Sequence, residues 1–208
     1  MKAFIFTGGL IYPENITEKP KAGDICISAD GGYNNAKRLG IHSNILLGDL
    51  DSIGEASIDK DTEVIKVPAE KDFTDTQFAI ETAISRGANE IIIIGGLSGR
   101  LDHTLSNLSI LEDLSARRVH ALITDGNNRV RFINSTSTLI ARSAYKYLSI
   151  ILASENAKGV SIEGCKYPLK NAKLDRRLQY AVSNEITGNC ALISIRKGSV
   201  YIVESRDA

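Results

Sequence analysis

The sequence predicts an α/β protein followed by an all-β region, on three observations. Short apolar runs alternate with helix-like segments through the first 125 residues, which is typical of a largely parallel sheet. Residues 90–94 read EIIII, a continuous apolar run of the kind that is buried on both faces of such a sheet. After about residue 135, short strand-like runs follow one another without a convincing helix. We therefore expect an N-terminal, largely parallel α/β (Rossmann-like) domain over residues 1–135 and a small C-terminal β-sandwich over residues 136–208.

The first domain is expected to contain six strands and three helices. Because strand–helix–strand connections are right-handed, the helices should cover both faces of the sheet. Glycines follow the first two helices directly, as is common at helix ends. The expected strands cover residues 2–7, 24–29, 45–47, 63–67, 90–94 and 121–124, and the expected helices cover residues 33–39, 74–86 and 103–114.

The second domain is expected to contain only short strands, separated by turn residues such as Gly188-Asn189 and Lys197-Gly198. No proline- or serine-rich linker precedes it, so the boundary is a change of hydrophobic period. The expected strands cover residues 136–141, 145–152, 159–163, 181–186, 191–196 and 200–204.

Charge is distributed unevenly along a chain of 208 residues whose formal net charge is zero. Residues 1–135 hold 14 Lys and Arg against 19 Asp and Glu, a net charge of −5, and residues 136–208 hold 11 against 6, a net charge of +5. Two halves of opposite net charge favour two domains, with a site for a polyanion and its metal ion between them. Ordinary scatter of surface charge explains the numbers equally well.

Several protein classes are disfavoured by composition. The cysteines number three and lack CxxC spacing, which argues against a disulfide framework and a zinc site and favours a reducing, cytoplasmic location. The first residues do not resemble a signal peptide, and no apolar run approaches the ~18 residues that span a bilayer. No basic tract with interleaved aromatics is present, so we expect neither a membrane nor a nucleic acid as partner.

The central motif is Gly48-Asp49-Leu50-Asp51-Ser52, directly after the expected strand at residues 45–47. Gly48 allows the chain to turn without steric cost, so that Asp49 and Asp51 can face one point. Two carboxylates this close repel each other, and Mg²⁺ shared with phosphate and water oxygens is the natural counter-ion. A polar turn with two solvated aspartates is the alternative.

Glycines and acids follow other strands too, and in a parallel sheet these strand ends gather along one ligand-binding edge. Glycines there let backbone N–H groups approach phosphate oxygens, and helix N-termini at Thr74 and His103 favour an anion. Arg100 can bind phosphate in two-point fashion, and Asp72 can join the metal site. The segments are Gly8-Gly9, Asp30-Gly31-Gly32, Lys71-Asp72-Phe73-Thr74-Asp75 and Gly95 to His103.

Each of these signals has a purely structural alternative. Glycine pairs after strands are usually turns, and Thr74 can simply cap its helix with Asp75 in the first turn. Arg100 and Asp102 can form a structural ion pair, and His103 can be a loop histidine. The co-occurrence of the signals, without a GxxxxGK[ST] motif, favours an acid-rich nucleotide site that uses a metal ion.

Together these motifs resemble thiamine pyrophosphokinase. The match rests on Asp30-Gly31-Gly32, on residues 48–52 and 71–75, and on Gly95-Gly96-x-x-Gly99-Arg100-x-Asp102-His103; Tyr167-Pro168-Leu169 and Ser183-Asn184-Glu185 are similar to the family's thiamine-side signature. The resemblance implies diphosphate transfer from ATP to the thiamine hydroxyl, releasing AMP, with Mg²⁺. It also implies a homodimer whose active site lies at the subunit interface.

The resemblance further implies roles for individual residues. Metal ligands would be Asp49, Asp51 and Asp72; ATP would contact Asp30, Gly31, Gly32, Thr74, Asp75 and His103; thiamine would contact Ser183 and Asn184. Asp72, Arg100 and Asp102 would be catalytic: Arg100 stabilises the transition state, and one of the two aspartates accepts the hydroxyl proton. Ser98, Val182 and the absence of tryptophan depart from the family pattern. A pyrophosphokinase for another alcohol and a non-catalytic thiamine or nucleotide sensor are the alternatives.

Overall fold

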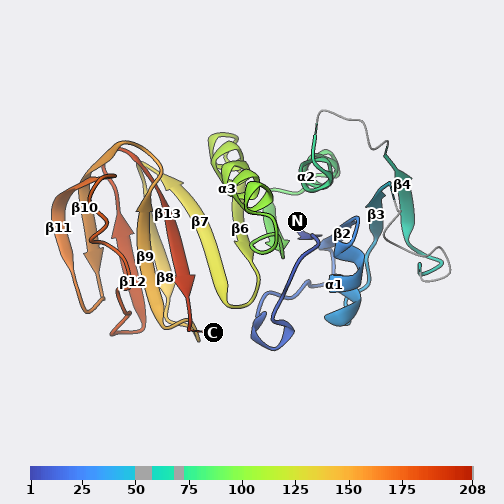
Figure 1. The fold of residues 1–208 in the computed structure, drawn as a ribbon, viewed down its shortest axis with the longest axis horizontal. Coiled ribbons are helices and arrows are strands. Elements are labelled where there is room, and N and C mark those ends of the chain that lie inside the picture. The colour runs from blue at the N-terminus through green and yellow to red at the C-terminus, as the bar shows by residue number, and fades with distance from the viewer. Residues whose placement is uncertain (50–57, 68–72, 208) are drawn as a thin grey trace. The chain divides into compact units, whose positions relative to one another are not determined.

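The protein is a mixed α/β fold in two compact units, Met1–Gly126 and Asn127–Ala208. The structure, a computed structural model, describes residues 1–49, 58–67 and 73–207. The first unit contains a parallel sheet with helices, and the second contains antiparallel strands (Figure 1). No helix in the described part of the chain is long and apolar enough to cross a membrane.

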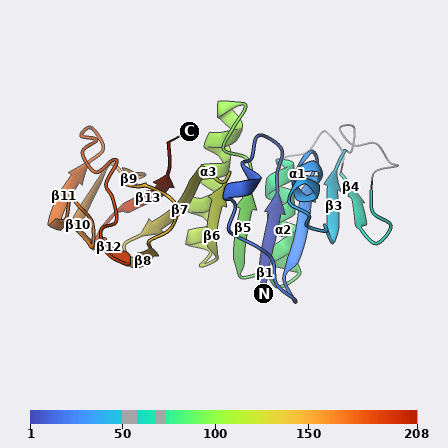
Figure 2. The same cartoon turned by 90° about the horizontal axis from the view of Figure 1, so that it is seen from below.

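The sheet of the first unit has six parallel strands in the order β4-β3-β2-β1-β5-β6 (Figure 2). Apolar residues fill its middle strands, where Ile5 in β1 and Ile93 in β5 are both 0% exposed. All six strands expected from the sequence are present. Their bounds are β1 Lys2–Phe6, β2 Ile25–Ala29, β3 Ile45–Gly48, β4 Glu63–Lys66, β5 Glu90–Ile94 and β6 His120–Thr124.

Helices lie on both sides of this sheet, as expected: α1 on one side, α2 and α3 on the other (Figure 1). Ala36 of α1 packs in one core cluster with Phe4 and Phe6 of β1. Because side chains alternate along a strand, the neighbouring apolar residues of β1 point to the opposite face. The bounds are α1 Gly32–Arg38, α2 Asp75–Ser85 and α3 Leu101–Ala116, with a short 3₁₀ helix, η1, at Pro13–Asn15.

The second unit contains two antiparallel groups of strands, in the orders β7-β13-β9 and β11-β10-β12-β8. Both groups contribute to one buried cluster, which includes Ile150, Ile202, Val160 and Ile193. The bounds are β7 Asn128–Asn134, β8 Ser137–Ala141, β9 Tyr147–Leu152, β10 Asn156–Glu163, β11 Leu169–Asp175, β12 Cys190–Ser194 and β13 Ser199–Ser205.

Two strands of the second unit were not expected from the sequence, and one expected strand is wrong. β11 (LKNAKLD) is an edge strand in which only one residue is buried, and its sequence lacks an apolar alternation. β7 belongs to the second unit although it precedes residue 135, where the sequence period changes. Residues 181–186 form isolated bridges at Asn184 and Ile186 and no strand, and the Asn184 side chain bonds the backbone of Tyr167 and Glu185.

Candidate active site

The carboxyl ends of the parallel strands meet at one edge of the first unit, as the motif positions predicted. The amide of Asp30, after β2, donates to Leu47 O of β3 at 2.8 Å. The amide of Gly96, after β5, donates to Gly8 O after β1 at 3.3 Å. Segments far apart in the sequence therefore touch directly at this edge, where open α/β sheets bind ligands.

Two carboxylates follow the adjacent strands β2 and β3. Gly48 has φ +146°, and a side chain there would place its Cβ 3.2 Å from Cβ of Asp30. Only glycine therefore allows this turn to lie against Asp30, whose own φ is +44° and whose Oδ1 atom is buried. Asp49 is exposed one residue further on. Asp51 and Asp72 lie outside the described residues, among which no group of three His, Cys, Asp or Glu side chains is placed to hold a metal ion.

Gly32 brings the start of α1 into direct contact with the end of β1. A Cβ atom at this position would lie 2.0 Å from Phe6 O and 2.8 Å from Cα of Thr7. Those are backbone atoms at the carboxyl end of β1, where close packing leaves no room for them to move aside. Gly31 precedes the helix without offering a capping side chain. The Asp30-Gly31-Gly32 motif therefore has a packing role in addition to any contact with ligand.

Two buried asparagines, which the motif analysis missed, hold the glycine-containing loops. Asn35 of α1 donates from Nδ2 to Thr7 O at 2.8 Å and to Gly9 O at 3.0 Å. Asn107 of α3 donates from Nδ2 to Gly96 O at 3.0 Å. The two side chains are only 4% and 6% exposed. A buried asparagine in an otherwise apolar helix face was the available signal, because such a group must find hydrogen-bond partners.

Arg100 and Asp102 form the ion pair that was the structural alternative for these residues. The guanidinium donates from Nε to Oδ1 at 3.1 Å and from Nη2 to Oδ2 at 2.6 Å, and both side chains are exposed. The His103 amide also donates to Asp102 Oδ1, at 3.0 Å. The Arg100 hydrogen bond lowers the pKa of Asp102 to about 2. Asp102 is therefore a weak proton acceptor while this pair is intact.

Thr74 caps α2, as the structural alternative expected. Its hydroxyl accepts from the Gln77 amide at 3.2 Å, and Asp75 occupies the first helical position, where the helix dipole favours an acid. Capping leaves the Thr74 backbone and the Asp75 carboxylate at the N-terminus of α2.

In the second unit, the side chain of Asn184 stabilises the backbone turn at Tyr167. Its Oδ1 accepts from the amides of Tyr167 and Glu185, each at 2.9 Å, and its Nδ2 donates to Tyr167 O at 2.8 Å. The side chain is buried, at 5% exposed. Ser183 beside it has φ +58°, and its amide donates to Ser149 Oγ at 2.9 Å. Asn184 thus joins the two segments that carry the thiamine-side signature.

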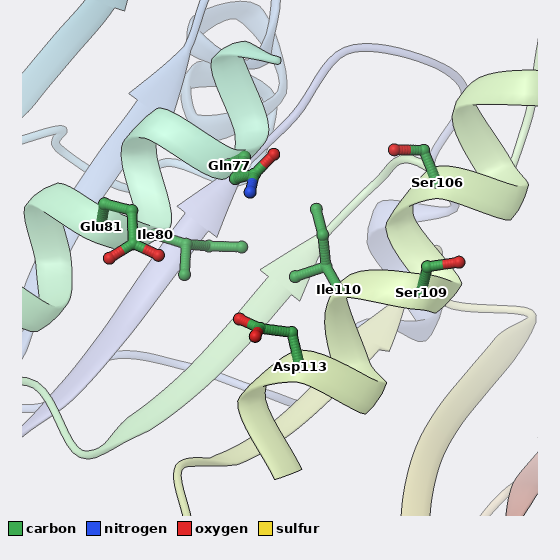
Figure 3. Close-up of a pocket in the computed structure, with 7 residues that line it drawn as sticks. All are labelled: Gln77, Ile80, Glu81, Ser106, Ser109, Ile110 and Asp113. Atoms are coloured by element: carbon green, nitrogen blue, oxygen red, sulfur yellow. The ribbon is translucent and has the colours of Figure 1, made fainter. Parts of the chain in front are cut away.

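A separate depression of about 200 Å³ lies between α2 and α3 (Figure 3). Ile80 and Ile110 face each other across it, and Glu81 and Asp113 are bridged by Arg117. None of the residues singled out from the sequence lines it. Its lining residues are Gln77, Ile80, Glu81, Ser106, Ser109, Ile110 and Asp113.

Comparison with known proteins assigns both units. The family model described as "Thiamin pyrophosphokinase, catalytic domain" matches residues 18–123, and "Thiamin pyrophosphokinase, vitamin B1 binding domain" matches residues 136–200. The chain belongs to the thiamin pyrophosphokinase family. The resemblance inferred from the motifs is confirmed.

Individual members of the thiamin pyrophosphokinase family align over most of the chain. Thiamine pyrophosphokinase of Bacillus subtilis is 30% identical over 87% of this chain and 87% of its own length. Thiamin pyrophosphokinase 1 of Caenorhabditis elegans is 28% identical over 92% and 82%. A crystal structure of the Bacillus subtilis protein superposes with a TM-score of 0.90 at 27% identity, covering 100% of both chains.

Proposed function

We propose that this protein transfers a diphosphate group from ATP to the hydroxyl of thiamine, giving thiamine diphosphate and AMP. One observation carries the proposal: glycine-containing turns and carboxylates after β1, β2, β3 and β5 lie along one edge of the unit that matches the family's catalytic domain. Family membership supplies the reaction class, and the edge supplies groups suited to a triphosphate and its counter-ion.

The proposed division of labour follows the two units. The Rossmann-like unit, Met1–Gly126, binds ATP with Mg²⁺, and the β-sandwich unit, Asn127–Ala208, binds thiamine. We also propose that the protein is a cytoplasmic homodimer with its active site at the subunit interface. The opposite net charges of the two halves, −5 and +5, support an arrangement in which a basic unit faces an acidic one.

The residues present suit magnesium. The buried Oδ1 of Asp30 and the exposed carboxylate of Asp49 follow neighbouring strands whose backbones are in contact, and oxygen donors are the ligands that Mg²⁺ prefers. Asp49 would hold the ion together with Asp51 and Asp72, which lie outside the described residues, while Asp30 would contact ATP with Gly31 and Gly32. When bound, Mg²⁺ neutralises charge on the phosphate oxygens.

The ion pair at the start of α3 divides the catalytic roles. Asp102 orients the Arg100 guanidinium, which is exposed and retains N–H groups for the phosphates in the transition state. Because the same pair lowers the pKa of Asp102 to about 2, we favour Asp72 as the acceptor of the hydroxyl proton. Thr74, Asp75 and His103 complete the nucleotide contacts.

On the thiamine side, Ser183 and Asn184 act differently in this proposal. Ser183 has a strained, left-handed backbone and lies outside the strands. Its side chain is therefore not held to the alternation of side chains along a strand. Asn184 uses Oδ1 twice and Nδ2 once within the protein, which leaves one Nδ2 hydrogen for a ligand. Asn184 would thus donate one hydrogen bond to thiamine, and its main effect is to stabilise the turn at Tyr167.

The test is AMP formation from ATP with Mg²⁺, with and without thiamine. We expect thiamine-dependent AMP release in the wild type and at least a ~100-fold loss of kcat in Asp49→Asn, because a metal-ligating carboxylate is removed. Asp113→Asn, an exposed acid on α3, is the matched control and should retain activity.

Other outcomes identify the alternatives. AMP release with a pterin or another primary alcohol, but not with thiamine, would assign a different pyrophosphokinase. Tight binding of thiamine or ATP without any AMP formation would indicate a sensor. Full activity of Asp49→Asn would refute the metal role of this residue.

A further inference from the structure

The loop after β1 and the loop after β5 are in direct contact at the proposed nucleotide edge. Gly96 N donates to Gly8 O at 3.3 Å, and a side chain on Gly95 would meet Thr7 O at 2.8 Å. These two loops carry Gly8, Gly9, Gly95, Gly96 and Gly99, which belong to the glycine-containing turns at this edge. Their relative position therefore decides the geometry offered to ATP.

Ser98 links the two loops through its hydroxyl group. Its Oγ accepts from the Leu10 amide at 2.7 Å and lies 3.4 Å from Leu10 O, to which it can donate. Gly9 packs against the same atom, since a Cβ there would lie 2.8 Å from Ser98 Oγ. The Ser98 hydroxyl thus bonds both the backbone N–H and the backbone carbonyl of Leu10, which is 88 positions away in the sequence.

The other side chains that hold these loops approach from the protein interior. Asn35 and Asn107 are buried and bind Thr7, Gly9 and Gly96 through carbonyl oxygens. Ser98 is half-buried and Leu10 is 52% exposed, so their contact lies at the solvent side, where a ligand would enter. The asparagines fix each loop to a helix, whereas Ser98 fixes one loop to the other.

We propose that Ser98 is a positioning residue that holds the Gly8–Leu10 segment in the shape that accepts the phosphates of ATP. The inference rests on the proposed binding of ATP at this edge. A free loop would have to be ordered when ATP binds, and that cost would appear as weaker affinity. Ser98 touches no reacting atom in this account, so the rate of the chemical step should not depend on it.

The first measurement is nucleotide affinity. Ser98→Ala should raise the Kd of a non-hydrolysable ATP analogue, measured calorimetrically with Mg²⁺, and the KM for ATP by about 5-fold, which corresponds to roughly 1 kcal/mol. The kcat and the KM for thiamine should stay within about 2-fold. Ser98→Thr keeps the hydroxyl and should restore most of the affinity. Ser85→Ala is the matched control, because the Ser85 hydroxyl donates to Thr82 O within its own helix.

The second measurement is amide hydrogen exchange of the unliganded protein. In Ser98→Ala the Leu10 amide should exchange about 10-fold faster, while the Tyr12 amide of the same loop, bonded to Asp125 O at 2.7 Å, should keep its protection. Faster exchange at both amides would mean that the whole loop is lost and would overturn the specific role.

The outcomes separate this inference from the proposed function. If the wild type forms no AMP, the function fails, yet analogue affinity and Leu10 exchange still test Ser98. If the wild type forms AMP and Ser98→Ala shows unchanged affinity for the analogue, the positioning role is wrong, whatever the exchange at Leu10. Equal losses in kcat for Ser98→Ala and Ser98→Thr would also overturn it.

Discussion

Asn35 in the first unit and Asn184 in the second are buried to nearly the same extent, 4% and 5% exposed, and both hold loops of the proposed site. The two side chains differ in how many backbone hydrogen bonds they donate and how many they accept. Asn35 donates twice from Nδ2 to carbonyl oxygens, whereas Asn184 accepts twice at Oδ1 and donates once. The family motif drew attention to Asn184 as a ligand contact and passed over Asn35. The comparison teaches that a motif residue can act mainly on its own backbone.

Buried thiols provide local reporters for the two regions. Cys26 packs in the same cluster as Ala36, beside Asn35, and Cys165 bridges to Ile186, close to Asn184. Burial, reinforced by the charge of Asp24, raises the pKa of Cys26 to about 11, and burial also raises the pKa of Cys165. Cys190 is an exposed free thiol.

We expect the largest effect in thiol labelling of the native protein at pH 8. Cys190 should react at least ~100-fold faster than Cys26, because only about one thousandth of a thiol with this pKa is thiolate at that pH. Peptide mass spectrometry after timed alkylation measures each site. Comparable rates at the two cysteines in the folded protein would contradict the burial of the Asn35 region.

The raised pKa of Cys26 also predicts how the stability of the protein depends on pH. The pKa of Cys26 is raised in the folded state, so between pH ~9 and ~11 the unfolded chain has already lost the proton that the native chain keeps. The contribution of this thiol to the free energy of unfolding is therefore fully present below pH ~9 and decreases as the pH rises toward 11. Cys26→Ala should remove that part of the slope, as urea titrations at several pH values can measure.

Replacing each asparagine by aspartate distinguishes donor from acceptor. Asn35→Asp removes both donated bonds and places a carboxylate against two carbonyl oxygens, with only the exposed Arg38, at 3.5 Å from Oδ1, as partial compensation. We expect a loss of about 3 kcal/mol in the free energy of unfolding. Asn184→Asp keeps both accepted bonds and should cost about 1 kcal/mol.

Urea unfolding of the two variants, with thiol labelling to locate the opening, checks this order. Asn35→Asp should expose Cys26 first, and Asn184→Asp should expose Cys165 first. A larger cost for Asn184→Asp than for Asn35→Asp would show that the assigned amide orientations are wrong.

Alanine substitutions should separate the two substrates. Asn35→Ala loosens the loop after β1 and should raise the KM for ATP about 5-fold, with little change for thiamine. Asn184→Ala releases the Tyr167 turn and should raise the KM for thiamine by a similar factor. Steady-state kinetics with each substrate varied in turn measures both. A rise in both KM values for either variant would mean that the two regions do not act on separate ligands.

The smallest effect is expected for an exposed ionic contact. Arg117 bridges Glu81 and Asp113 beside the depression between α2 and α3, and all three side chains are at least 35% exposed. Arg117→Gln should lower the free energy of unfolding by less than ~1 kcal/mol, because solvent screens exposed pairs. The loss should shrink further in 1 M salt, and a loss that is unchanged by salt would point to packing of the arginine stem instead.

The sequence alone determined the strands and helices of the first unit and which residue types follow its strands. Period-2 and continuous apolar runs identified all six strands of the first unit, and the glycines and acids after them predicted a ligand-binding edge. The order of those motifs also identified the family. The strand β11 was not predicted, because an edge strand buries few side chains and so shows little apolar alternation in its sequence.

Only the tertiary structure decided which polar groups hold the loops. Asn35, Ser98 and Asn107 bind backbone atoms between 11 and 88 positions away, and no local pattern encodes which of many carbonyl oxygens a side chain will reach. The structure also decided between the alternatives that the sequence left open for Arg100 and Asp102, which form the ion pair, and it directed the Asn184 side chain into its own turn. The physical reason is that hydrophobic pattern specifies which face is buried, whereas hydrogen-bond partners are chosen only after the packed elements bring them within about 3 Å.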